Sequence, residues 1–184
     1  ILSQDFENEI ECLGDAKGDA ILNEANDMIK EKMEENPAFY EKLSEKIKRI
    51  IKDYESKRIR KENFLKEAIK IKLELRGESY EENIKYDEKI RDNKCARAVY
   101  DNTEKYIKDK ETLIEFSLFV DKLFETTSNK PDWQNSSDII KNIENDIDDK
   151  LSDLEDESKI EKLDNETVID FLRILRKIGL SAYS

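Results

Sequence analysis

Apolar side chains recur at spacings of three and four along almost the whole chain, with charged and polar residues between them. Because an α-helix turns once in about 3.6 residues, this spacing places the apolar positions on one helical face. No stretch alternates apolar and polar residues for long enough to predict a strand. The pattern therefore predicts an all-α fold, a bundle-like assembly of six to nine helices.

The clearest apolar stripes lie in two separate helices, and both stripes are expected to be buried. One comprises Tyr40, Leu43, Ile47, Ile50, Ile51 and Tyr54, and the other Ile139, Ile140, Ile143, Ile147, Leu151 and Leu154. A weaker stripe places Ile21, Ala25, Met28 and Ile29 inward. Helices are expected at roughly 2–13, 20–35, 37–54, 61–75, 79–91, 96–107, 111–124, 139–154 and 167–178.

Residues with special backbone preferences mark several of these helix ends. Asn36 and Pro37 predict a helix start, because asparagine caps a helix and proline is tolerated at its first position. Gly77 is expected to end the fourth helix, and Gly179 the last one. Gly18 is expected to break the chain before the second helix.

Capping and loop signals define the remaining boundaries. Ser79–Glu82 has the spacing of a capping box, and a break is expected near Asp92–Asn93. Thr126–Trp133 is the clearest predicted loop, because Ser, Asn and Pro cluster there. Either Asn135 or Ser136 is expected to cap the helix that follows.

Composition supports long, solvated helices. Charged residues make up 42% of the 184 positions and apolar residues 37%, with only 4 Gly and 2 Pro. The length suits one helical assembly domain over 1–184, with 1–78 and 79–184 as its candidate sub-parts. A start at Ile1 suggests part of a longer protein. With no signal peptide and no apolar run of bilayer length, a soluble cytoplasmic protein is expected.

The residue inventory excludes several kinds of active site. The chain has no histidine, and its two cysteines, Cys12 and Cys95, are expected to be buried free thiols. A zinc site or a Ser-His-Asp triad cannot be built from these residues, and four scattered glycines cannot form a phosphate-binding loop. No catalytic, cofactor-binding or metal-binding residues are therefore predicted.

One motif does resemble a nuclease site. Pro131-Asp132 followed by Asp148 and Lys150 matches the order of residues in metal-dependent PD…(D/E)xK nucleases. In such a site the last acid and the lysine must project to the same side, as alternate residues of a strand do. Here both lie within a predicted helix, where two positions differ by about 200°. A solvated helix face is the preferred interpretation.

The charge is unevenly distributed. The chain carries −12 overall, yet residues 42–76 hold 13 basic and 6 acidic side chains, whereas residues 131–170 hold 4 basic and 14 acidic ones. A basic stretch in an acidic protein is a candidate docking face. Trp133, the single tryptophan, is foremost a candidate packing anchor. The candidate interface residues are Lys48, Lys52, Arg58, Arg60, Lys61 and Trp133.

A longer stretch carries a family resemblance. Residues 17–71, above all EKMEENPAFYEKLSEKI (31–47) and YESKRI followed four residues later by Phe-Leu, resemble the C-terminal helical region of the R (restriction, motor) subunit of type I restriction enzymes. PDWQNSSDIIKNIENDI (131–147) resembles the Asp-Trp and helix near the end of that subunit. The family usually has Asp where this chain has Asn36. Many relatives have a basic helix after the Trp and stop there, whereas here that helix is acidic and a further one is predicted.

The resemblance implies a division of labour. In this family the nuclease domain and two ATP-driven motor domains precede the helical region, which is associated with docking on the core formed by the M and S subunits. The implied function is a non-catalytic docking domain, with ATP and Mg²⁺ used by the parent subunit and no cofactor in this region. Its expected partners are the M and S subunits and the preceding motor domains, and contact with DNA is left open. The alternative is a stand-alone nucleic-acid-binding module that uses the basic 42–76 surface.

Overall fold

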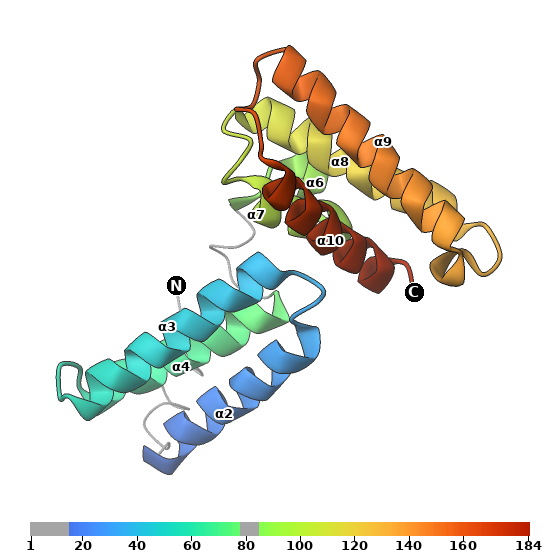
Figure 1. Ribbon diagram of the computed structural model, residues 1–184. Coiled ribbons are helices and arrows are strands. Elements are labelled where there is room, and N and C mark those ends of the chain that lie inside the picture. The colour runs from blue at the N-terminus through green and yellow to red at the C-terminus, as the bar shows by residue number, and fades with distance from the viewer. Residues whose placement is uncertain (1–14, 78–84) are drawn as a thin grey trace. The chain divides into compact units, whose positions relative to one another are not determined.

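The computed structural model of the protein describes residues 15–77 and 85–184 (Figure 1). Within these residues the chain forms eight α-helices and one short 3₁₀ helix, and no strand. The predicted all-α fold is confirmed. The helices are α2 (Asp15–Lys32), α3 (Pro37–Glu55), α4 (Lys61–Arg76), α6 (Glu88–Arg91), α7 (Lys94–Thr103), α8 (Lys110–Ser128), η1 (Trp133–Asn135), α9 (Ser137–Asp156) and α10 (Asn165–Ala182).

The chain divides into two compact units. Unit 1 combines the chain up to Met33 with Tyr40–Lys85, and so contains α2, α4 and all but the first three residues of α3. Unit 2 combines Glu34–Phe39 with Tyr86–Ser184. The short segment 34–39 therefore belongs to the same unit as helices that lie much later in the chain.

In the described part of unit 1 there are three helices, and Gly18 has an unexpected role among them. Gly18 is buried inside α2 and does not break the chain, so the sequence prediction was wrong. A Cβ at this position would lie 2.5 Å from Cε1 of Phe64 on α4. Because glycine has no side chain, α2 can approach the Phe64 ring directly. On the same helix Leu22, Ala25 and Ile29 are buried.

Of the predicted inward positions of α2, Ala25 and Ile29 are confirmed, whereas Ile21 and Met28 are only half-buried and Leu22 is buried. The other boundaries in unit 1 agree with the sequence. Gly77 ends α4 with φ of +71°, as a left-handed residue after a helix does. The predicted capping box Ser79–Glu82, Cys12 and the first expected helix lie outside the described residues.

Local hydrogen bonds confirm both predicted caps of the striped helices. The backbone N–H of Phe39 donates to Oδ1 of Asn36 at 3.2 Å, at the start of α3. The N–H of Ile139 donates to Oγ of Ser136 at 3.4 Å, at the start of α9. Both stripes are buried at four positions each, namely Tyr40, Leu43, Ile47 and Ile50, and Ile143, Ile147, Leu151 and Leu154.

The core of unit 2 lies among its four longer helices. α10 contacts α7, α8 and α9, and α8 contacts α7 and α9. Gly179 lies within α10, whereas the sequence predicted that it would end the helix. A Cβ there would overlap three ring carbons of Phe124, so close packing of α10 on α8 explains the glycine. The core residues include Phe116, Phe124, Trp133, Phe171 and Leu175, with further members from each helix.

Two other boundaries in unit 2 differ from the predictions. α7 ends at Thr103 and does not continue to Ile107, although Ile107 remains buried in the turn that follows. α8 continues to Ser128, so the predicted loop starts later, at Asn129. The side chains of Ser128 and Asn129 both donate to the backbone carbonyl of Glu125, at 2.7 and 3.1 Å, which satisfies an acceptor at the helix end.

Candidate docking surface

The basic residues predicted as an interface gather at the end of a helical hairpin in unit 1. In Figure 1, α3 and α4 run antiparallel, side by side, and are joined by a tight turn. Lys48 and Lys52 are one helical turn apart on α3, Arg58 and Arg60 lie in the turn, and Lys61 starts α4. All five side chains are exposed. These five residues are called the basic corner below.

The turn has a defined backbone geometry. The N–H of Arg58 donates to the carbonyl of Asp53 at 2.8 Å, and the N–H of Lys57 to that of Tyr54 at 2.9 Å. Lys57 has φ of +55°. This pattern is a Schellman-type helix end, which here uses lysine where glycine is usual. Lys57 is exposed at the tip of the turn and adds a further cation to this surface. It was not among the predicted interface residues, although it directly precedes Arg58 in the sequence.

Packing between α3 and α4 supports the basic corner. The rings of Tyr54 and Phe64 stack with centroids 4.3 Å apart and planes 15° from parallel. Further along the hairpin, Nζ of Lys46 lies 2.5 Å from Oε1 of Glu74, and both side chains are largely buried. The basic side chains are therefore mounted on two helices that are held together by an aromatic pair and an ion pair.

The corner keeps most of its positive charge accessible. Arg58 forms an ion pair with Asp53 at 3.4 Å, but the Arg58 side chain is 69% exposed. Exposed pairs of this kind contribute at most about 1 kcal/mol and are screened by salt. The chemistry available at this surface is attraction of an anionic partner.

Trp133 is not part of this surface. It belongs to unit 2, its side chain is only 4% exposed, and its ring packs edge-to-face on Phe124 with centroids 6.1 Å apart. Its inclusion among the interface candidates is corrected, because a side chain this deeply buried is a packing anchor of the core. The acidic α9 follows it, with Asp138, Asp146 and Asp149 exposed.

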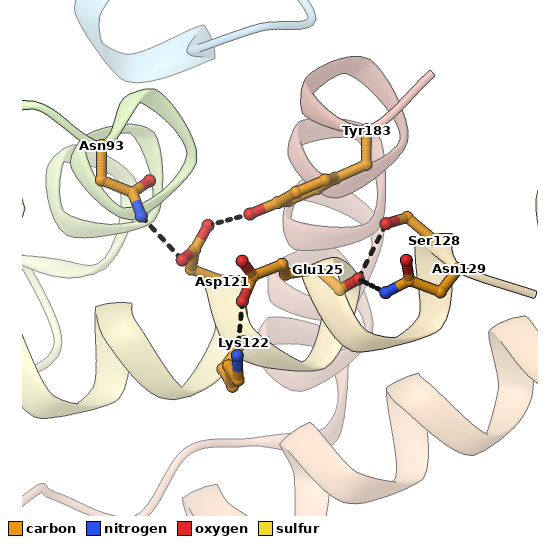
Figure 2. Close-up of polar contacts among 7 residues, drawn as sticks. All are labelled: Asn93, Asp121, Lys122, Glu125, Ser128, Asn129 and Tyr183. Carbon is orange, nitrogen blue, oxygen red and sulfur yellow. Dashed lines mark hydrogen bonds and ion pairs between the residues drawn. The ribbon is translucent and has the colours of Figure 1, made fainter.

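Unit 2 contains a buried polar cluster around Asp121 of α8, which sequence reasoning did not find (Figure 2). The Asp121 carboxylate is 7% exposed and accepts from the side-chain amide of Asn93 at 2.7 Å and from the phenol of Tyr183 at 2.5 Å. Asn93 also caps α7 through the N–H of Ala96. The cluster connects α8 to the start of α7 and the end of α10.

This cluster does not activate a nucleophile. Burial raises the pKa of the Cys95 thiol, and the nearby Asp121 carboxylate raises it further, so the thiol stays protonated. Burial and the hydrogen bond to Asp121 also raise the pKa of Tyr183. A groove of about 460 Å³ lies beside these residues, and it is lined by groups of both charges, including Glu35 and Lys94.

The second half of the nuclease-like motif lies in a helix, as the sequence predicted. Asp148 and Lys150 both lie within α9, Asp148 exposed and Lys150 half-buried, while Pro131 and Asp132 precede η1. No group of three or more His, Cys, Asp or Glu side chains in the described ranges is placed to hold a metal ion. Asp148 and Lys150 thus lie two positions apart on one helix, as the sequence predicted.

Comparisons with protein-family models, curated proteins and solved structures find no significant match to this chain. None of the helices in residues 15–77 and 85–184 combines the length and apolar character needed to cross a membrane.

Proposed function

We propose that this chain is a helical docking domain of a type I restriction enzyme R subunit, which attaches the ATP-driven DNA translocase and nuclease to the M–S methyltransferase core. The observation that carries the proposal is the basic corner. The residues that resemble the R subunit, 17–71, are those that form α2, α3 and most of α4. YESKRI, one of the two most characteristic parts of that stretch, covers the end of α3 and the turn that presents Arg58, and it precedes Arg60.

A docking role suits the physical character of the corner. Charges at the rim of an interface steer two proteins together and select the correct partner, while a few buried anchors supply most of the affinity. The basic corner supplies such charges in a chain of −12 overall. In this proposal the domain itself performs no reaction, and ATP and Mg²⁺ act in the preceding parts of the parent subunit.

The proposal is tested by charge reversal in the full-length R subunit. Arg58→Glu, Arg60→Glu and Lys61→Glu together should weaken assembly onto the M–S core on the order of tenfold at low salt. The difference from the unmodified subunit should shrink as salt is added, because exposed charges are screened. Assembly is measured by analytical ultracentrifugation, and the helical content by circular dichroism.

A matched control changes the same amount of charge on unit 2. Lys108→Glu, Lys110→Glu and Lys141→Glu reverse three exposed lysines outside the basic corner. These variants should assemble normally. An unchanged affinity and salt dependence for the corner variant would exclude the corner as the docking surface, and the acidic surface of residues 138–170 would be tested next.

The exposure of five cations on one hairpin also favours a second candidate, a stand-alone nucleic-acid-binding module. Phosphate contacts are salt-dependent and independent of M and S, so this candidate predicts DNA binding by the isolated chain near physiological salt. The docking proposal predicts none under those conditions. The presence of M and S genes beside the gene for the parent protein would favour docking.

A further inference from the structure

A second buried polar cluster lies on α7, outside the basic corner and the Asp121 cluster. Asp101 and Asn102 are adjacent residues that are 4% and 8% exposed, and Tyr86 beside them is 4% exposed. Buried polar groups of this kind are costly unless their hydrogen bonds are satisfied. Much of that satisfaction comes from a segment more than sixty residues earlier in the chain.

Asn36 is the centre of the arrangement. Its Nδ2 donates to Oδ2 of Asp101 at 2.8 Å, and its Oδ1 accepts from Nδ2 of Asn102 at 2.9 Å. Asn102 in turn accepts from the backbone N–H of Ala38 at 3.1 Å. The phenol of Tyr86 donates to the same Asp101 oxygen at 2.6 Å. The side chain that caps α3 is thus also bound on both its polar atoms by α7.

Specific polar contacts tie this segment to the rest of unit 2, beside the partial burial of Pro37, Ala38 and Phe39. None of residues 34–39 is buried, although all belong to unit 2. At its start, Glu34 pairs with Lys177 of α10 at 2.8 Å, and both side chains are well exposed. An exposed ion pair holds weakly, so among these polar contacts the hydrogen bonds to Asp101 and Asn102 hold the segment more firmly than the Glu34–Lys177 pair.

The chemistry of Asp101 also explains why residue 36 is asparagine. Asparagine and aspartate cap helices about equally well, so capping alone does not distinguish them. Only asparagine can donate a hydrogen bond to the Asp101 carboxylate. Aspartate at position 36 would place two carboxylates in contact at a partly buried site, where like charges repel strongly.

We propose that Asp101 and Asn102 form a clasp that holds residues 34–39 as a detachable strap, and that Asp101 specifies asparagine at position 36. When the clasp opens, the strap and the first turn of α3 are released together. The first turn of α3, from Pro37, is then ordered only while Asp101 and Asn102 of α7 hold the strap. The clasp therefore controls a local conformational change within unit 2.

The test is amide hydrogen exchange in the 184-residue chain carrying Asn36→Asp. The reporters are the N–H groups of Ala38 and Phe39, which are bound by Asn102 and by residue 36. Repulsion from Asp101 should open the clasp and speed exchange at both amides by about tenfold or more. If residue 36 acts only as a cap, aspartate preserves the cap, exchange at Phe39 stays unchanged, and the proposal is overturned.

A charge-matched rescue separates the clasp from a general loss of stability. In Asn36→Asp combined with Asp101→Asn, the donor and acceptor exchange places, so protection at Ala38 and Phe39 should return. Asp101→Asn alone should have little effect, because its side-chain oxygen can still accept from Asn36. Failure of the double variant to restore protection, or to restore folding if Asn36→Asp does not fold, would overturn the proposal.

Tyr183→Phe is the control for effects on unit 2 as a whole, since it removes a hydrogen bond to Asp121 and leaves the clasp intact. Exchange at Ala38 and Phe39 should then stay at the level of the unmodified chain. If this control speeds both amides as much as Asn36→Asp does, exchange occurs by opening of the whole unit, and the strap is not a separate element.

Discussion

Two glycines of this chain lie inside helices, each facing a phenylalanine ring of another helix. Gly18 of α2 faces Phe64 of α4, and Gly179 of α10 faces Phe124 of α8. A sequence-based interpretation treats glycine as a helix breaker, because its backbone is flexible and its helix propensity is low. Here the packing against another helix requires glycine, since in both places a methyl group would overlap the phenylalanine ring.

Gly179→Ala is expected to destabilise the protein by about 1–3 kcal/mol, the usual cost of overfilling a packed core. Alanine improves helix propensity by up to about 1 kcal/mol, but the added methyl would contact a ring that is 1% exposed and has little room to move. Urea unfolding measures the change. Ser181→Ala, at an exposed position of the same helix, should stay within about 0.5 kcal/mol, and equal stability of both variants would contradict the packing argument.

Tyr183 leads to a prediction about alkaline pH. Because its pKa is raised in the folded protein, its phenol ionises more readily in the unfolded chain, so stability should fall as pH rises above about 10. Tyr183→Phe removes this ionisation, so its unfolding free energy should fall less steeply over that pH range. At neutral pH its unfolding free energy should be lower than that of the unmodified protein, because the hydrogen bond to Asp121 is lost. Chemical unfolding at a series of pH values measures the slopes. Identical slopes in the two proteins would disprove the contribution of Tyr183.

At the scale of elements, the sequence predicted helix ends best where the signal is local. Asn36, Gly77 and Ser136 act on backbone groups within a few residues, so their roles can be recognised without knowing the fold. The inward face of α2 was predicted in part, with Ala25 and Ile29 correct and Leu22 missed, because the orientation of a helix depends on contacts with other helices. The clasp could not be predicted, since Asn36 and Asp101 are 65 residues apart in the chain.

For the candidate surface too, local features were predicted from the sequence and features that depend on tertiary structure were not. The charge run predicted that Arg58, Arg60 and Lys61 would be exposed together, because charged residues seldom enter a core. The placement of Trp133 depended on tertiary structure, and its 4% exposure removes it from the surface. Asp121 gave no signal in the sequence, since its partners Asn93 and Tyr183 come from two distant segments.

Two helix ends lead to a prediction of increased stability. Lys57 after α3 and Ser158 after α9 have φ of +55° and +58°, a left-handed conformation that is unfavourable for residues with a side chain. Lys57→Gly and Ser158→Gly should each stabilise the protein by roughly 0.5–1 kcal/mol, because glycine adopts this conformation without strain. Lys48→Gly, inside α3, should instead destabilise it by about 1 kcal/mol. Thermal unfolding that shows no gain for either turn variant would contradict the strain argument.

At the scale of the whole molecule, polar groups inside the protein serve structure. Every buried side-chain nitrogen or oxygen in the described residues has a hydrogen-bond partner. The buried carboxylates of Asp101 and Asp121 are bound by amides and phenols that connect helices. Among the described residues, the basic corner is the part of the surface on which the docking proposal rests, in a chain of −12.

DNA binding by the isolated chain is the prediction that best separates the two proposed functions. The five cations of the corner, together with the exposed Lys57 beside them, can contact at most about six phosphates, which corresponds to a slope no steeper than about −5.4 for log K against log salt. Because the overall charge of −12 opposes binding, we expect no complex near physiological salt and only a weak one at low salt.

Arg58→Glu, Arg60→Glu and Lys61→Glu together should abolish that weak complex. Gel shifts or fluorescence anisotropy across a salt series measure both quantities, and tight binding near physiological salt that the same three substitutions remove would favour the nucleic-acid-binding module over the docking domain.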